Sequence, residues 1–433
     1  MALLTTTTTA RFATITASAA VKQTMARKYS INSLQKPLRR QQQQNIRKSN
    51  NINMMQTKRR FISSSALTIE KTTDEGRFTS KPPKEKLQFG ITLSDHMLTV
   101  EWNKEKGGWG DPKIAPTQNL SISPAASSLH YGLQCFEGMK AYRSLSNDND
   151  DNDLLLFRPD LNMARLQNSM SRLSMPGSDF DSDELIKCIQ ELVRADERWV
   201  PDGEGYSLYV RPTVVATHPF LGLAAPESLL LYVITSPVGP YYKTGFNPIR
   251  LTADTKYIRA WPGGTGDCKV GGNYGPTMKA AAEAAERGYS QVLWLFGEED
   301  SITEVGSMNV FFYLQNKDTG RNELVTPPLS RGDILPGVTR ASIVELTRSW
   351  GEFDVTERTP TMPEICEAAK EGRLIEAFGA GTAAVVTPIE GIQYKGVDIE
   401  IKAIGELTQR VWDELTAIQY GKLKGPEGWS VVV

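Results

Sequence analysis

Cysteine and histidine are scarce in this sequence of 433 residues. It contains four cysteines and three histidines, and no two of the cysteines have CxxC spacing. Structural zinc sites and disulfide frameworks need several such residues at short spacings, so we expect neither a metal site nor a disulfide framework. No stretch of about 20 apolar residues occurs, which excludes a helix long enough to span a bilayer.

Acidic residues are absent from the first part of the chain, where the earliest is Glu70. The first 60 residues contain twelve basic residues and many Ser and Thr. A basic, hydroxyl-rich, acid-free leader is typical of an organelle import presequence, and the lack of a compact apolar core argues against a secretory signal. The low-complexity runs Thr5–Thr9 and Gln41–Gln44 leave a disordered polar tail as the alternative.

Two places in the leader resemble the mitochondrial processing pattern of Arg, any residue and an aromatic. They are Arg27-Lys28-Tyr29 and Arg59-Arg60-Phe61. We therefore expect residues 1–61 to form a disordered presequence, followed by a linker at 62–87. The expected destination is the mitochondrial matrix; the plastid, or the cytoplasm if the leader is not a presequence, is the alternative.

The rest of the chain is acidic, with 37 basic against 50 acidic residues once the leader is subtracted. A phosphate backbone needs a basic face, so we expect no nucleic-acid partner. The length exceeds that of a usual single domain and predicts two. A Pro-, Gly- and Tyr-rich stretch at 238–245 predicts the connection between a small α/β domain, 88–237, and a large domain, 246–433.

Hydrophobic periodicity predicts mixed helices and strands in the first half of the body and many short strands in the second. An acidic Asn/Asp run at 147–153 indicates a solvated loop. Together these patterns favour a two-domain α+β enzyme. Strands are predicted at 98–102, 154–157, 207–215, 228–234, 291–296 and 310–314, and helices at 160–173, 181–200, 275–288, 337–350 and 402–420.

Six short stretches in both halves of the body carry a pattern that is specific only as an ordered set. In this order and spacing they resemble the eukaryotic branched-chain amino acid aminotransferases, members of fold type IV of the pyridoxal-phosphate enzymes. The resemblance runs from about residue 88 to the C-terminus. The stretches are YGLQCFEGMK at 131–140, SLYVRP at 207–212, GDCKVGGNYG at 266–275, ITEVG at 302–306, LPGVTR at 335–340 and FGAGTA at 378–383.

This resemblance implies an α+β fold with a smaller N-terminal α/β domain and a larger C-terminal pseudo-barrel domain that binds the cofactor. It implies pyridoxal 5'-phosphate as cofactor and a homodimer in which two subunits contribute to each site. The implied reaction converts L-leucine, L-isoleucine or L-valine with 2-oxoglutarate into branched-chain 2-oxo acids and L-glutamate. Such a reaction is either the last step of synthesis or the first step of degradation of these amino acids.

Lys269 is the residue on which the implied chemistry depends. Judged by residue type alone, a lysine is a solvated surface charge. Lys269, however, precedes a glycine-rich run that lets the backbone approach a bound group closely. The resemblance makes it the Schiff-base lysine, a role that needs an amine whose ammonium form is destabilised.

Glu304 would support that chemistry from the other end of the cofactor. The resemblance implies that it faces the pyridine nitrogen and keeps the ring protonated, whereas residue type alone favours a surface carboxylate. Tyr274 matches the tyrosine that hydrogen-bonds the cofactor's phenolic oxygen. Asp300, which lies just before Glu304 in the sequence, is expected to be an exposed turn residue.

A phosphate site is predicted where Gly337, Val338 and Thr339 begin a helix, because a helix N-terminus offers unpaired N–H donors and a positive dipole end. On the sequence alone a plain helix start remains the alternative. The resemblance adds Arg165 as the phosphate arginine. Arg158 is its rival, and spacing does not separate the two.

The substrate pocket must accept branched aliphatic side chains and also the distal carboxylate of glutamate. A cluster of Tyr131, Phe136 and Tyr209 would supply the apolar wall, and Arg211 the distal charge. The alternative reading makes the three aromatic residues ordinary members of a sheet core.

The GTA sequence that ends at Ala383 is implied to bind polar groups. By resemblance, Thr382 contacts the phosphate, and the backbone of Thr382 and Ala383 holds the substrate's α-carboxylate together with Tyr209. Mammalian relatives carry a CxxC redox switch just after this sequence. This chain has Ala, Val, Val and Thr at 384–387, so we expect no such switch.

Two rival functions remain. A D-amino acid aminotransferase or an aminodeoxychorismate lyase shares the lysine and the glutamate, but not the YVRP and FEGMK stretches together. A binding or scaffold protein could keep the fold without activity. The presence of Lys269, Glu304, Tyr274 and Arg165 together argues against that reading.

Overall fold

The computed structural model describes residues 59–72, 81–146, 153–240 and 246–433. The described residues form one compact unit. Nearly all of the presequence expected at 1–61, and most of the connection expected at 238–245, therefore lie outside the described residues. The acidic run at 147–153 lies outside them as well, except for Asp153.

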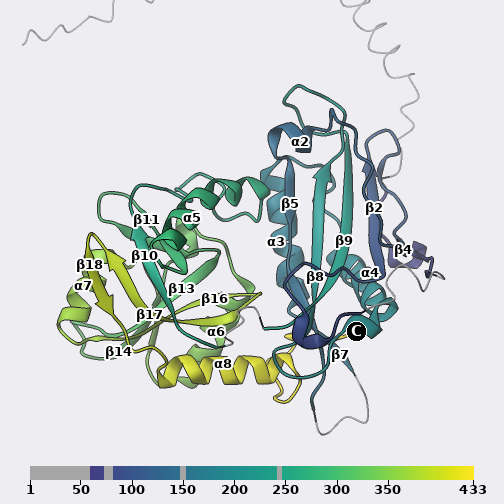
Figure 1. Ribbon diagram of the computed structural model, residues 1–433. Coiled ribbons are helices and arrows are strands. Elements are labelled where there is room, and N and C mark those ends of the chain that lie inside the picture. Colours follow the sequence, from purple (N-terminus) through teal and green to yellow (C-terminus); the bar gives the residue numbers. More distant parts are fainter. Residues whose placement is uncertain (1–58, 73–80, 147–152, 241–245) are drawn as a thin grey trace, which may run out of the picture. The chain divides into compact units, whose positions relative to one another are not determined.

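The described residues form two sheets, and the first of these has ten strands, most of them antiparallel (Figure 1). Its order is β1-β4-β2-β9-β8-β6-β7-β19, with β3 paired to β2 and β5 paired to β8. The strands are β1 (Thr68–Ile69), β2 (His96–Asn103), β3 (Gly108–Trp109), β4 (Lys113–Pro116), β5 (Gln134–Phe136), β6 (Met139–Arg143), β7 (Leu154–Phe157), β8 (Ser207–Ala216), β9 (Ser228–Val238) and β19 (Ser430–Val432).

Helices α3 (Pro159–Arg172) and α4 (Ser182–Ala195) pack with this sheet around one hydrophobic core. The apolar stripe of α4 is fully buried, and the Asp181 side chain accepts the N–H groups of Asp183 and Glu184, which caps the helix. Helix α3 begins with Pro159, which needs no N–H partner at that position. A short helix, α2 (Ser127–Tyr131), precedes β5.

The second sheet has nine strands, and six of them form a closed ring. The path runs β12-β11-β10-β17-β16-β13, and the additional pairing of β12 with β13 closes it. This ring agrees with the expected pseudo-barrel. The strands are β10 (Ile249–Asp254), β11 (Gln291–Phe296), β12 (Ser301–Val305), β13 (Met308–Gln315), β14 (Asn322–Thr326), β15 (Asp354–Glu357), β16 (Leu374–Gly381), β17 (Val385–Tyr394) and β18 (Val397–Glu400).

Four helices accompany the second sheet: α5 (Met278–Glu286), α6 (Val338–Trp350), α7 (Met362–Lys370) and α8 (Glu406–Gln419). Apolar residues of α6, α8, β13 and β16 form one shared core. None of the helices in the described part of the chain is both long and apolar enough to cross a membrane. The 3-10 helices are η1 (Ser64–Ala66), η2 (Lys84–Lys86), η3 (Glu197–Trp199), η4 (Gly271–Asn273), η5 (Gly275–Thr277) and η6 (Leu329–Arg331).

The predicted strands and helices are all present, and the errors lie at their ends. The helix predicted at 181–200 ends at Ala195 and is followed by η3, and the helix predicted from 402 begins at Glu406. The helix predicted from 275 begins at Met278, after two 3-10 turns. Helix ends depend on local capping that periodicity does not report.

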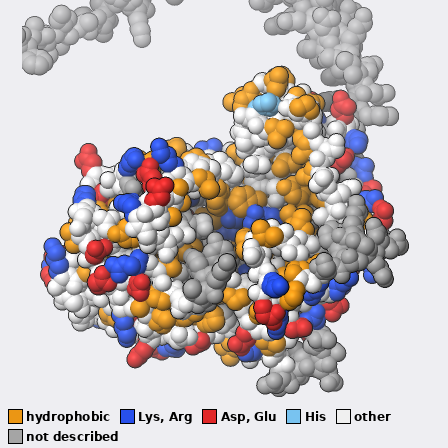
Figure 2. All heavy atoms as spheres, viewed as in Figure 1, with side chains coloured by type: hydrophobic (Ala, Val, Ile, Leu, Met, Phe, Trp, Pro, Cys, Tyr) orange, Lys and Arg blue, Asp and Glu red, His pale blue; other side chains and the backbone are white. Residues whose placement is uncertain are grey.

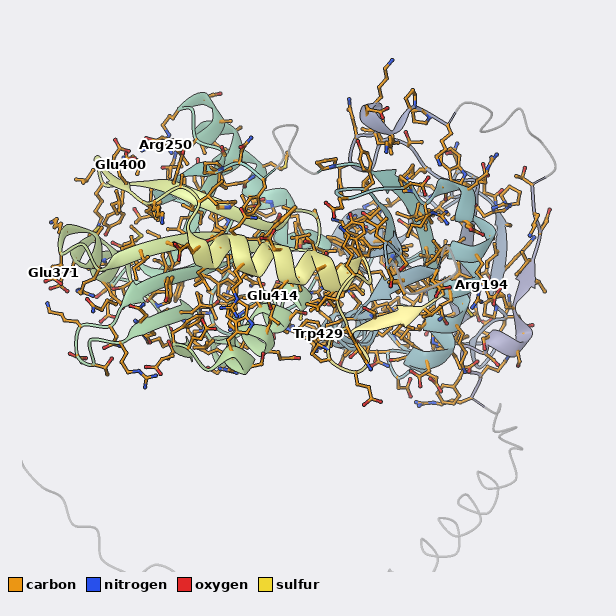
Figure 3. The ribbon with its side chains drawn as sticks, turned by 90° about the horizontal axis from the view of Figure 1, so that it is seen from below. Arg194, Arg250, Glu371, Glu400, Glu414 and Trp429 are labelled. Carbon is orange, nitrogen blue, oxygen red and sulfur yellow. The ribbon has the colours of Figure 1, made fainter. Side chains whose placement is uncertain are left out.

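The C-terminal residues return to the first sheet. Strand β19 pairs with β7, and the Trp429 ring meets the Phe157 ring edge-on at 5.7 Å (Figure 3). The guanidinium of Arg158 lies 4.7 Å from the centre of the Trp429 ring. These contacts tie the last residues of the chain to the strand that leads into α3.

We predict that Phe311→Ala lowers the free energy of unfolding by about 3–5 kcal/mol, because the ring is fully buried and stacked on Phe378 at 5.0 Å. Val397→Ala, on the exposed strand β18, should change it by less than about 0.5 kcal/mol. Denaturant titration of both variants measures the difference. Equal losses would contradict this account of the core.

Candidate active site

A cavity of about 360 Å³ is lined by residues from both sheets. Figure 2 shows Lys or Arg side chains inside a hollow that hydrophobic side chains surround. The volume suits a small-molecule ligand. Among its lining residues are Phe136, Arg165, Tyr209, Arg211, Lys269, Tyr274, Gly337, Val338, Thr339, Thr382 and Ala383, all predicted from the sequence.

Lys269 lies on a segment that follows β10 and is attached to the first sheet. Its N–H donates to Ser169 Oγ at 2.9 Å, and its carbonyl accepts the N–H of Phe136 at 3.0 Å. An isolated β-bridge joins the next residue, Val270, to Cys135. Backbone contacts on both sides of Lys269 therefore fix the start of its side chain.

The Lys269 amine is enclosed by aromatic rings. Its Nζ lies 3.1 Å from Tyr274 Oη and 4.7 Å from the centre of the Phe136 ring. Burial, and secondarily the positive charge of Arg165, lower the pKa of Lys269 to about 8. A much larger fraction of Lys269 is therefore in the neutral amine form at physiological pH than in a solvated lysine. Burial and the charge of Glu304 raise the pKa of Tyr274 to about 12, so its phenol stays protonated.

Glu304 is on β12 and is 2% exposed. It lines an adjoining cavity of about 150 Å³ that shares Tyr274 with the larger one. Its carboxylate accepts the N–H of Leu335 at 2.6 Å and pairs with Arg259 at 3.2 Å. Burial raises the pKa of Glu304, and the charge of Arg259 opposes that shift. The sequence did not reveal Arg259, because it lies in an irregular segment without a motif.

Asp300 corrects one expectation. It is buried rather than exposed, and its carboxylate accepts hydrogen bonds from Tyr394 Oη and from Lys395 Nζ. Those partners follow more than 90 residues later, at the β17–β18 turn, so local sequence could not indicate the burial.

Arg165 and Arg158 are separated by the structure. Arg165 on α3 lines the cavity, forms two hydrogen bonds of 2.8 Å to Glu137, and donates to the Pro336 carbonyl at 2.9 Å. A guanidinium has five N–H donors, so two remain for a ligand. Arg158 instead pairs with Glu345 and lies outside this cavity.

Glu137 is a site residue whose role the sequence did not reveal. It is fully buried. Both of its carboxylate oxygens accept hydrogen bonds from Arg165, and one also accepts a hydrogen bond from Asn162 at 2.8 Å. The sequence feature that could have indicated this role is the position of Glu137 in the FEGMK stretch. A buried ion pair with this geometry holds Arg165 in one orientation.

Helix α6 begins beside Arg165. Its N-cap, Gly337, offers no capping side chain, and Val338 and Thr339 line the cavity. No side chain caps the first N–H groups of the helix, which is the arrangement that a phosphate site at a helix N-terminus would use. Thr382, from the turn between β16 and β17, also lines the cavity.

The predicted substrate residues are brought together with one exception. The Arg211 guanidinium lies 4.9 Å from the Phe136 ring and 5.0 Å from the Tyr209 ring, and it donates to Tyr209 Oη at 3.0 Å. Phe89 packs edge-on against Tyr209 at 4.7 Å and also lines the cavity. Phe89 precedes all six stretches that carry the resemblance, so the sequence did not indicate its role.

Tyr131 is the exception. It ends α2, is 42% exposed, and donates its hydroxyl to the Leu221 carbonyl. It does not line the cavity of its own chain. Within one chain, Tyr131 therefore does not join Phe136 and Tyr209, and the prediction that these three aromatic residues form a cluster is wrong. Gly132, in the left-handed conformation at φ 62°, ends the helix between Tyr131 and β5.

Comparisons with known proteins agree with this geometry. The amino-transferase class IV pattern matches residues 134–392. A Dictyostelium discoideum branched-chain-amino-acid aminotransferase is 50% identical over 88% of this chain and 98% of its own length. A cytosolic one from Ovis aries is 51% identical over 82% and 90%. A mitochondrial one from Saccharomyces cerevisiae is 51% identical, also over 82% and 90%.

A solved structure shares the fold. It is the holo-form of a branched-chain amino acid aminotransferase from Thermobaculum terrenum, with pyridoxal phosphate. Its TM-score is 0.62 at 22% identity, over 78% of this chain and 98% of that one.

The residues present fit pyridoxal phosphate. Lys269 supplies a desolvated amine for the aldehyde, Tyr274 a phenol, and Glu304 a buried carboxylate for the ring nitrogen. Arg165 and the start of α6 supply charge and N–H donors for the phosphate. Each polar part of the cofactor has a partner of the matching chemistry.

We predict that Arg165→Lys raises the dissociation constant for pyridoxal phosphate about tenfold, because lysine cannot hold Glu137 and the phosphate in one planar fork. Arg158→Lys is a matched control, since both arginines are buried and ion-paired. It should leave the constant within about twofold. Absorbance titration of the cofactor-free variants measures both. A larger increase in the dissociation constant for Arg158→Lys than for Arg165→Lys would make Arg158 the phosphate-binding arginine instead.

Proposed function

This chain belongs to the branched-chain-amino-acid aminotransferases of amino-transferase class IV, and we propose that it transfers the amino group of L-leucine, L-isoleucine or L-valine to 2-oxoglutarate. The products are branched-chain 2-oxo acids and L-glutamate. One observation carries the proposal: the buried amine of Lys269 and the buried carboxylate of Glu304 flank Tyr274 in adjoining cavities. When bound, pyridoxal phosphate supplies a protonated aromatic ring that withdraws electrons from the substrate's Cα.

Lys269 moves the proton in the proposed mechanism. With pyridoxal phosphate bound, the Lys269 amine would take the proton from the substrate's Cα and hold it for return to the reacting group. Its burial supports this role, because a base with a pKa near 8 can both accept and release a proton near neutral pH.

Glu304 and Tyr274 hold the two ends of the ring in place. Arg259 pairs with Glu304 and favours its charged form, which is the form that keeps the ring nitrogen protonated. Tyr274, protonated because its pKa is raised, would donate a hydrogen bond to the phenolic oxygen of the cofactor. Neither residue has to change its protonation state during the reaction.

The pocket accommodates two kinds of substrate. Phe89, Phe136 and Tyr209 offer apolar surface to a branched aliphatic side chain. Arg211 lies among these rings and can meet the distal carboxylate of 2-oxoglutarate or glutamate. The backbone of Thr382 and Ala383 would hold the α-carboxylate, which all of these substrates share.

We also propose a homodimer. Exposed apolar side chains gather at α2 and the 217–227 loop, where Figure 2 shows hydrophobic side chains beside a histidine. Such a patch favours association with another protein surface. In a dimer, Tyr131 could line the cavity of the other subunit, which would restore its expected role. The patch comprises Leu129, Tyr131, Phe220, Leu221 and Leu223.

The basic leader supports a proposal of import into the mitochondrial matrix, and the Saccharomyces cerevisiae relative is named as mitochondrial. We propose that the presequence lies within residues 1–61. The linker expected at 62–87 is wrong in its first part, because Thr68–Ile69 form strand β1 of the first sheet and Ile62 is buried in the core of that sheet. We further propose that 238–245 connects a domain at 88–237 to one at 246–433. The last long strand of the first sheet, β9, ends at Val238, which supports that division.

We predict that the purified protein exchanges amino groups between L-leucine and 2-oxoglutarate and is inactive with D-alanine. Its pocket has an apolar wall and the YVRP and FEGMK stretches that the D-specific relatives lack together. Coupled detection of L-glutamate measures both reactions. Activity with D-alanine and none with L-leucine would move the protein to the first rival function.

The rate of cofactor capture should depend on pH in a way that reveals the burial of Lys269. Only the neutral amine attacks the aldehyde, so the second-order rate constant should rise with pH and level off above about 8. A solvated lysine would give a rise that continues to about 10.4. Stopped-flow absorbance on the cofactor-free protein distinguishes the two curves.

A further inference from the structure

The turn at 382–384, between β16 and β17, has cavities on two sides. Ala383 and Ala384 line the candidate active-site cavity and also a second cavity of about 410 Å³. Side chains this small, next to two open spaces, have few packing contacts to hold the turn in one shape. Something else has to fix the turn if its backbone is to bind a carboxylate.

The residue that follows the turn is strained. Val385 has a φ of 63°, in the left-handed region that a β-branched residue rarely adopts. Such a conformation costs about 1–3 kcal/mol and persists only where surrounding contacts support it. The turn therefore needs an external restraint.

Lys140 provides a contact from the other sheet. It lies on β6, is 8% exposed, and its Nζ donates to the Ala383 carbonyl at 2.8 Å. In the part of the chain that the structure describes, no carboxylate pairs with it. Burial lowers the pKa of Lys140 to about 8, so the ammonium form still prevails at neutral pH. A charge-assisted hydrogen bond from a buried side chain is stronger than one between neutral groups.

We propose that Lys140 is a positioning residue that orients the Ala383–Ala384 peptide for binding the substrate's α-carboxylate. Lys140 lines the second cavity and not the first, so the Ala383 carbonyl points away from the active site. A trans peptide is planar, so the N–H of Ala384 points the opposite way, toward the active-site cavity. This inference rests on the proposed function, which assigns the α-carboxylate to the backbone of Thr382 and Ala383, and it adds the N–H of Ala384 from the same turn.

The test compares L-leucine with 3-methylbutylamine, which is leucine without its carboxylate. Lys140→Met keeps the length of the side chain but removes the donor. We expect it to raise the dissociation constant of leucine by about 10- to 100-fold and to leave that of the amine within about twofold. Spectral titration of the cofactor-loaded enzyme measures both constants. Lys140→Arg, which can still donate to Ala383, should recover most of the leucine affinity.

Lys395→Met is the matched control, since Lys395 supports a different turn through Asp300. It should change neither constant. Equal weakening of leucine and the amine by Lys140→Met, or no weakening, would overturn the proposal. If Lys140→Met does not fold, Lys140→Gln replaces it in the same comparison, and equal weakening of both ligands or no weakening would again overturn the proposal. A wild-type enzyme that does not react with leucine would refute the proposed function instead, so the two failures are distinguishable.

Discussion

Burial of the Lys269 amine is the constraint on which the rest of the site depends. An ammonium group removed from water is unstable, and that instability turns an ordinary lysine into a nucleophile and a base. The burial requires both halves of the chain. The second half supplies the segment that carries Lys269, and Ser169 and Phe136 of the first half anchor its backbone. The aromatic rings around the amine then exclude water from it.

Two buried ion pairs flank this amine, Arg165 with Glu137 and Arg259 with Glu304. Buried pairs contribute little net stability, because desolvation offsets much of the attraction. Their value here is orientation. Glu137 fixes the direction of Arg165, and Arg259 favours the charge on Glu304. In the proposed binding mode, the polar groups for both ends of the cofactor are thus held in place before it binds, which lowers the free-energy cost of ordering them.

Much of this architecture could be predicted from the sequence, because periodicity marks strands and helices and the ordered stretches mark Lys269 and Glu304. Contacts between distant segments could not. Asp300 is buried by a turn that follows more than 90 residues later, and Arg259 belongs to no motif. Tyr131 belongs to a recognised stretch but does not line the cavity, because the sequence of that stretch does not show where tertiary packing places each side chain. These errors share one cause: side-chain partners are set by tertiary packing rather than by local sequence.

The central claim is that Lys269, among all the lysines, bonds the cofactor. Lys140 is the most informative competitor, because it is also buried and burial also lowers its pKa to about 8. Residue type and electrostatics therefore do not distinguish them, whereas geometry does. Borohydride reduction of the cofactor-loaded enzyme, followed by peptide mapping, measures the outcome directly. The account predicts a pyridoxyl adduct on the peptide that contains Lys269, and an adduct on Lys140 or any other lysine would contradict it.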